Sequence, residues 1–87
     1  MTRRYVFTGK VQGVGFRQFV WKSQQDLNVT GFVRNLASGE VELVITGEDA
    51  SCDELLKRID VRFSENIDTI DLENIENGVF SEFVIRS

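Results

Sequence analysis

The sequence contains no histidine and a single cysteine, and both shortages exclude several kinds of catalytic and metal site. Without histidine, the chain cannot form Ser–His or Cys–His nucleophile pairs, nor a metal centre with histidine ligands. Cys52 on its own can form neither an internal disulfide nor a thiolate metal cluster, which favours a reducing compartment. We therefore expect no metal site and no cofactor.

Long apolar runs are also lacking. No stretch approaches the roughly 20 apolar residues that a membrane-spanning helix needs. The first seven residues, Met-Thr-Arg-Arg-Tyr-Val-Phe, are followed too soon by a glycine-rich stretch to supply the apolar centre of a signal peptide. We expect a cytoplasmic protein with no membrane partner.

The chain has 87 residues, of which 41% are hydrophobic, and this predicts one globular domain over residues 1–87. The formal net charge is −4, but residues 1–35 carry six basic side chains against one acidic. This asymmetry predicts either two solvated surfaces of opposite charge or an anion site in the N-terminal half. Nucleic acid is a poor partner for so acidic a chain, because its binding depends on many phosphate contacts.

Apolar spacing and turn residues predict an alternation of strands and helices. We expect strands at 4–10, 30–35, 40–46, 67–75 and 80–86, and helices at 16–27 and from about 49. Asn28 suits a left-handed residue after the first helix, and residues 49–51 offer caps for the second. The inner face of the second helix is expected to contain Cys52, Leu55, Leu56 and Ile59.

This order is the β-α-β-β-α-β pattern of the ferredoxin-like α+β sandwich. We expect one antiparallel sheet of four main strands plus a short fifth, with both helices on one face. Acidic residues alternate with Ile67, Ile70, Leu72 and Ile75 in and around the fourth strand, which predicts a solvated strand at the edge of the sheet.

The loop after the first strand predicts an anion site. Gly13 and Gly15 permit backbone angles at which successive amides point to one side, directly before a helix N-terminus. A tight turn without a ligand is the simpler interpretation of two glycines alone. The Walker and Rossmann spacings are both missing, so nucleotide binding gains no support.

Arg17 and Asn35 are the candidate side chains. Arg17 falls in the first turn of the helix, where the dipole disfavours a cation by ~0.3–1 kcal/mol, so an arginine there suits a shared anion better than plain solvent. Guanidinium also matches phosphate in a two-pronged geometry. Asn35 precedes a turn, where asparagine is common, but its amide could also hold one water.

Two stretches resemble the signatures of the acylphosphatase family. The first, Gly9-Lys-Val-Gln-Gly-Val-Gly-Phe-Arg17, is similar to G-x-V-Q-G-V-x-F-R. The second, Gly31-Phe-Val-Arg-Asn-Leu-Ala-Ser-Gly-Glu-Val41 followed by Gly47, is similar to G-aromatic-V-R-N-x3-G-x-V-x5-G. The two motifs occur in the family's order across residues 9–47.

The resemblance implies an enzyme that hydrolyses the carboxyl-phosphate bond of a small acyl phosphate to carboxylate and phosphate. We expect it to act as a monomer and without a metal, because the arginine and the amides neutralise the phosphate. The resemblance also implies that Arg17 binds the phosphoryl group together with loop amides and that Asn35 positions the attacking water. The cradle we expect comprises Gln12, Gly13, Val14, Gly15 and Phe16.

Two alternatives stay open. One is a non-catalytic module that binds acyl phosphate or carbamoyl phosphate, like the related domains of larger carbamoyl-transferring proteins. The other is an RNA-binding domain of the same topology, which would need exposed aromatic side chains on its central strands. Tyr5 and Phe7 alternate suitably for that, but they suit the core equally well.

Overall fold

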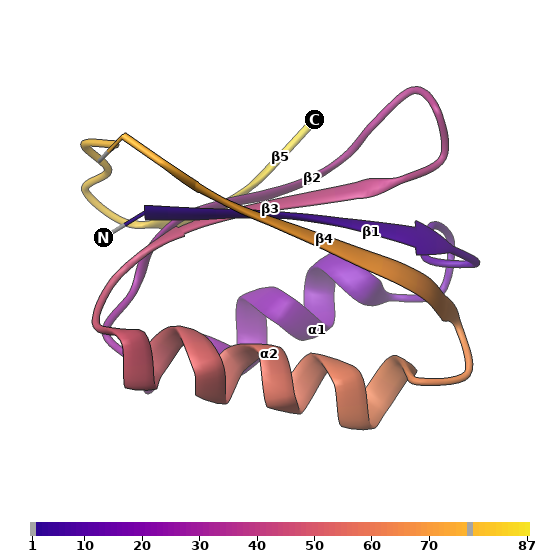
Figure 1. Cartoon of the computed structure of the whole chain (residues 1–87), viewed down its shortest axis with the longest axis horizontal. Coiled ribbons are helices and arrows are strands. Elements are labelled where there is room, and N and C mark those ends of the chain that lie inside the picture. The colour runs from indigo at the N-terminus through magenta and orange to yellow at the C-terminus, as the bar shows by residue number, and fades with distance from the viewer. Residues whose placement is uncertain (1, 77) are drawn as a thin grey trace.

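The computed structural model describes residues 2–76 and 78–87, in which one sheet is covered by helices on one face (Figure 1). The elements are β1 (Thr2–Gly9), α1 (Phe16–Ser23), β2 (Thr30–Asn35), β3 (Val41–Thr46), α2 (Asp49–Phe63), β4 (Ile67–Ile75) and β5 (Phe83–Arg86). The strands lie in the order β4-β1-β3-β2-β5. The ferredoxin-like α+β fold predicted from the element order is therefore confirmed.

The sheet is mixed rather than wholly antiparallel. The four main strands pair antiparallel, but β5 runs parallel to β2. The reason is that β4 ends at the same end of the sheet at which β2 begins. Ile75, the last residue of β4, pairs with Thr2. Thr2 also pairs with Thr46 of β3, and Thr46 pairs with Thr30, the first residue of β2. The chain leaving β4 crosses this end of the sheet and continues beside β2 in the same direction. The fifth strand begins at Phe83, three residues later than predicted.

The first helix is shorter than predicted. It ends at Ser23, and residues 24–28 form turns, in which Leu27 still packs against the core and so continues the apolar spacing. Gln24 donates from its side-chain Nε2 to the carbonyl oxygen of Trp21 at 2.9 Å, which satisfies a carbonyl at the helix end. Asn28 has the left-handed conformation predicted for it, with φ of 52°.

The second helix begins differently from the prediction. Its cap is Glu48, which makes no capping hydrogen bond through its side chain, and Asp49 lies inside the first turn. A carboxylate in that turn suits the positive end of the helix dipole, and Asp49 also forms an ion pair with Arg3 at 3.0 Å. Of the inner face that we predicted, Leu56 is only partly buried, while Phe63, which we did not predict, is 1% exposed.

The core lies between the sheet and the helices. Alternate residues of β1, β2 and β3 point toward the helices and are buried with the inner faces of α1 and α2: Tyr5, Phe7, Val33, Val41, Leu43, Ile45, Phe16, Val20, Cys52, Leu55, Ile59 and Phe63. The two strand aromatics that could have served an RNA surface are thus core residues.

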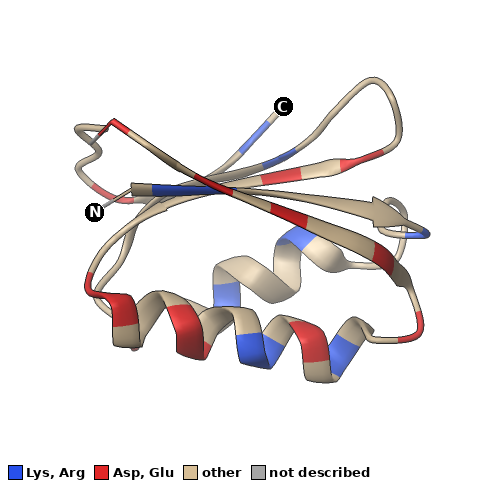
Figure 2. Ribbon diagram, viewed as in Figure 1, with Lys and Arg blue, Asp and Glu red and all other residues tan. Residues whose placement is uncertain are grey.

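The strand β4 forms one edge of the sheet and is exposed along almost its whole length. Acidic residues recur along this strand (Figure 2), so the predicted solvated edge is confirmed. Such charges hinder pairing of an edge strand with a second chain. Within the described residues, no helix is long and apolar enough to cross a membrane.

Candidate active site

The loop between β1 and α1 adopts a backbone that only glycine accepts readily. Gly13 has φ of 74° and Gly15 has φ of 83°, both in the left-handed region. A Cβ at either position would meet no atom within 4 Å, so the backbone conformation, and not crowding, requires glycine here. Gly15 is also the cap of α1 and provides no side chain to the first-turn amides, which leaves their N–H groups for another acceptor.

A cavity of about 150 Å³ opens where the start of α1 meets the ends of β2 and β5. Its lining residues are Val11, Gly13, Gly15, Phe16, Arg17, Gln18, Asn35 and Ile85. Five of the seven predicted site residues are therefore brought together around one space.

Two predicted cradle residues do not line this cavity. Val14 is half-buried and packs against the core. The side chain of Gln12 turns away to the β2–β3 hairpin, where its Nε2 donates to the carbonyl oxygens of Leu36 and Glu40. The apolar walls Val11 and Ile85 were missed, and Ile85 could not have been found because it reaches the site through the parallel pairing of β5.

Arg17 differs from most other arginines in its partners. Arg3, Arg4, Arg34 and Arg58 each form an ion pair with at least one carboxylate. Arg17 is half-buried, lines the cavity, and has neither an ion pair nor a side-chain hydrogen bond with any other residue in 2–76 or 78–87. Its five N–H donors therefore remain for an anion in the cavity.

Asn35 has an unsatisfied polar atom. It is the last residue of β2, and its Oδ1 is buried without a hydrogen-bond partner among the described residues. Leaving a buried acceptor unpaired costs ~1–3 kcal/mol, so such atoms require an explanation. The side chain of Asn35 also borders the cavity.

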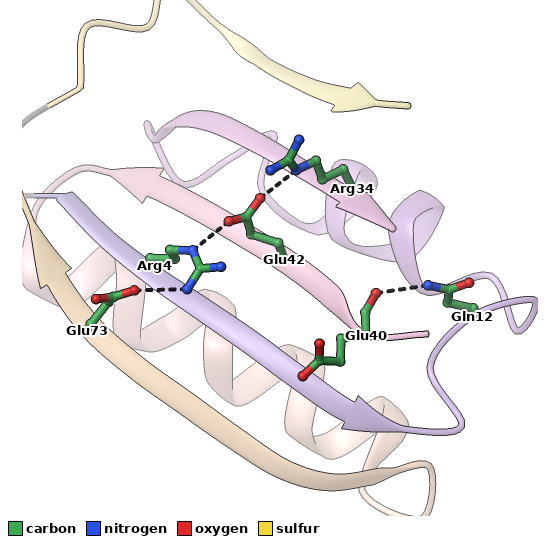
Figure 3. A network of polar contacts seen from close by, with 6 residues as sticks. All are labelled: Arg4, Gln12, Arg34, Glu40, Glu42 and Glu73. Carbon is green, nitrogen blue, oxygen red and sulfur yellow. Dashed lines mark hydrogen bonds and ion pairs between the residues drawn. The ribbon is translucent and has the colours of Figure 1, made fainter. Parts of the chain in front are cut away.

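The strand that carries Asn35 is held by an ion-pair network on the face of the sheet opposite the helices (Figure 3). Glu42 is 5% exposed and accepts from the Nε of Arg4 and from the Nε of Arg34, both at 2.5 Å. Arg4 also bonds to Glu73 at 2.9 Å. Burial raises the pKa of Glu42, but the two guanidinium hydrogen bonds outweigh it and hold that pKa below its ordinary value.

Other reactive groups lie away from the cavity. Cys52 is buried on the inner face of α2, where burial raises the pKa of its thiol and so disfavours a thiolate. Within residues 2–76 and 78–87, no cluster of three or more aspartate, glutamate or cysteine side chains could hold a metal ion. The polar side chains that line the cavity are therefore a guanidinium and two carboxamides, those of Arg17, Gln18 and Asn35.

Comparison with known proteins identifies one family. The family model described as acylphosphatase matches residues 3–85. A curated acylphosphatase of Pasteurella multocida is 32% identical over 88 aligned residues, covering 99% of this chain and 98% of that protein. Shorter matches to other curated acylphosphatases are 47–56% identical and span 42–58% of each.

Solved structures give the same result. An acylphosphatase from Coxiella burnetii superimposes with a TM-score of 0.84 and 34% identity, covering 98% of this chain and 90% of that one. Full-length HypF, solved with phosphate and nucleotide bound, matches with a TM-score of 0.81 and 30% identity over 99% of this chain, but only 12% of HypF. The chain belongs to the acylphosphatase family of enzymes.

Proposed function

We propose that this protein hydrolyses the carboxyl-phosphate bond of acyl phosphates to a carboxylate and inorganic phosphate. The observation that carries the proposal is the convergence of Arg17, the Gly13–Gly15 loop and Asn35 on one cavity. Phosphoryl transfer depends mainly on positioning and charge stabilisation, which these groups can supply.

Arg17 and the loop amides bind the phosphoryl group. The guanidinium takes two phosphate oxygens, and amides at the start of α1 donate to the others. These donors stabilise the charge that develops on the equatorial oxygens as the bond to the carboxylate breaks. We propose that no metal ion is required, because the guanidinium and the amides neutralise the phosphate.

Water is the nucleophile in this mechanism. Asn35 holds the water through its side-chain amide, which borders the cavity, and aims the water at phosphorus, opposite the leaving carboxylate. The acyl phosphate is an activated anhydride with a good leaving group, so no strong base is needed. The side chains that line the cavity include no serine, cysteine or carboxylate, which argues against a covalent intermediate.

The remaining features of the proposal concern the whole chain. We propose a single domain over residues 1–87 that acts as a cytoplasmic monomer, with an acyl phosphate and phosphate as its ligands and no cofactor. Nucleic acid is not a proposed partner, since Tyr5 and Phe7 are buried against the helices and cannot stack on bases.

The resemblance to a small part of HypF supports a second candidate function. In that case the same cavity would bind an acyl phosphate or carbamoyl phosphate without hydrolysing it. Asn35 favours hydrolysis, because a side-chain amide beside the phosphate cradle can place a water for attack, which a cradle that only binds does not need.

Hydrolysis of benzoyl phosphate by the purified protein, followed by its ultraviolet absorbance, separates these functions. We expect turnover well above the spontaneous rate and unchanged activity in EDTA. Binding of phosphate without turnover would select the binding module. Loss of activity on chelation, restored by a divalent cation, would contradict the metal-independent mechanism.

A further inference from the structure

The side chain of Gln12 connects the phosphate loop to the hairpin that carries Asn35 (Figure 3 shows the contact with Glu40). Its Nε2 lies 2.8 Å from the carbonyl oxygen of Leu36 and 2.9 Å from that of Glu40. Both N–H donors of the amide are thereby used on the hairpin. We call this pair of hydrogen bonds the Gln12 bridge.

The Gln12 bridge reaches both strands of the hairpin beside the site asparagine. Leu36 directly follows Asn35, and Glu40 directly precedes Val41, the residue paired with Asn35 across the ladder. On the other side, Gln12 directly precedes Gly13 of the cavity wall. A single nitrogen atom thus ties the phosphate loop to the end of both hairpin strands.

We infer that Gln12 is a positioning residue, whose side-chain amide sets the distance and direction between the phosphate loop and the water held by Asn35. This inference rests on the proposed hydrolysis and assigns a role to a side chain that does not itself line the cavity. In-line attack depends steeply on geometry, and a displacement of about 1 Å can lower the rate about 100-fold.

The stability of the fold should depend on the Gln12 bridge much less than the catalytic rate does. The carbonyl oxygen of Leu36 also accepts from the backbone N–H of Gly39 at 3.1 Å, and that of Glu40 accepts from the N–H of Leu36 at 2.8 Å. Both carbonyls keep a backbone partner when Gln12 loses its amide. The hairpin should therefore persist, while its position relative to the loop loosens.

The test is the Gln12→Met variant, which keeps the length of the side chain and removes the amide. We expect kcat on benzoyl phosphate to fall at least tenfold, while the inhibition constant for phosphate stays within about twofold. Gln25→Met is the matched control, because Gln25 is exposed and has no side-chain hydrogen bond among those found in the described residues. The control should keep wild-type kcat.

The Gln12→Glu variant adds a readout that a merely structural role would not produce. An ionised carboxylate cannot donate and would face two carbonyl oxygens, whereas the protonated acid regains one O–H donor. We expect the ratio of its kcat to that of wild type to rise as pH falls, while the same ratio for Gln12→Met stays flat.

Three results would overturn the inference. They are a wild-type kcat in Gln12→Met, an equal loss of kcat and phosphate affinity in that variant, and a pH-independent ratio in Gln12→Glu. If the wild-type protein itself fails to hydrolyse benzoyl phosphate, the proposed function falls and the positioning role falls with it. If the wild-type protein hydrolyses benzoyl phosphate and the Gln12 variants behave as the wild type does, the positioning role falls and the proposed function stands.

Discussion

Arg17 in the first turn of α1 and Asn35 at the end of β2 line the same cavity, although they come from different elements. Arg17 brings a charge with no partner among the described residues, and Asn35 brings a buried acceptor with none. A guanidinium and a side-chain amide bordering one cavity suit the two tasks proposed above, phosphate binding and water placement. Because the tasks differ, substitutions of the two residues should give different kinetic results.

Replacing Arg17 with alanine should weaken both binding and turnover. The guanidinium supplies charge-assisted hydrogen bonds worth ~1.5–3 kcal/mol each, so the inhibition constant for phosphate should rise at least tenfold. The same donors stabilise the transition state, and kcat should fall by about 100- to 1,000-fold. Steady-state kinetics with benzoyl phosphate and phosphate inhibition measure both quantities. Lys22→Ala, an exposed cation in the same helix, should change neither, and full activity in Arg17→Ala would refute the phosphate site.

Replacing Asn35 with alanine should separate turnover from binding. We expect kcat to fall about 100-fold or more, while phosphate inhibition changes less than about threefold, since the cradle remains. Stability should be kept or slightly increased, because the variant removes a buried oxygen that has no protein partner. Urea unfolding and inhibition kinetics check these points. A parallel loss of phosphate affinity would argue against water placement.

Gly15 should be sensitive to alanine for a backbone reason alone. Its φ of 83° costs an L-residue ~1–2 kcal/mol, although a Cβ there would contact nothing within 4 Å. We expect Gly15→Ala to lower stability by about that amount and to weaken phosphate binding as the loop adjusts. Gly39→Ala is the matched control, with φ of 99° and equally open surroundings in the β2–β3 turn, away from the cavity wall. It should lose similar stability and keep phosphate affinity; equal phosphate binding in both variants would contradict a role for the loop.

Much of this arrangement could be predicted from the sequence. Alternation in residues 41–46 and the Gly-rich loop before Phe16 gave the strands and the loop, because these patterns depend on local backbone preferences. What could not be predicted depended on distant parts of the chain. The direction of β5, and with it Ile85 in the cavity wall, follows from which end of the sheet β4 reaches.

The candidate site was predictable as a set of residues and not as a set of contacts. The motifs name Gln12 and Asn35, but nothing local indicates that the Gln12 side chain turns to the hairpin and leaves the cavity to its neighbours. The helix from Phe16 was predicted too long because Leu27 keeps its apolar contact from a turn. Hydrophobic spacing reports burial, and burial does not require a helix.

Glu42 gives the protein a stability that depends on pH. Its pKa is lowered in the folded state by Arg4 and Arg34, below the ordinary value of 4.5 expected when unfolded. A lowered pKa stabilises the fold fully above that ordinary value, and the contribution is lost as pH falls through the folded pKa. Removing the charge should therefore lower the free energy of unfolding near neutral pH, and lower it less in acid.

Glu42→Gln should lower the free energy of unfolding by about 1–3 kcal/mol at pH 7, because it breaks two charge-assisted bonds while both arginines can turn toward water. The difference from wild type should shrink as pH falls from the ordinary value of 4.5 through the lowered folded pKa, where the wild-type carboxylate itself becomes protonated. Glu73→Gln is the control: this carboxylate is 57% exposed, and its pair with Arg4 should contribute at most about 1 kcal/mol. Urea unfolding at several pH values measures each difference. A loss in Glu42→Gln that stays constant from pH 7 down to the lowest pH at which the wild type remains folded would show that packing, and not the charge, makes this residue stabilising.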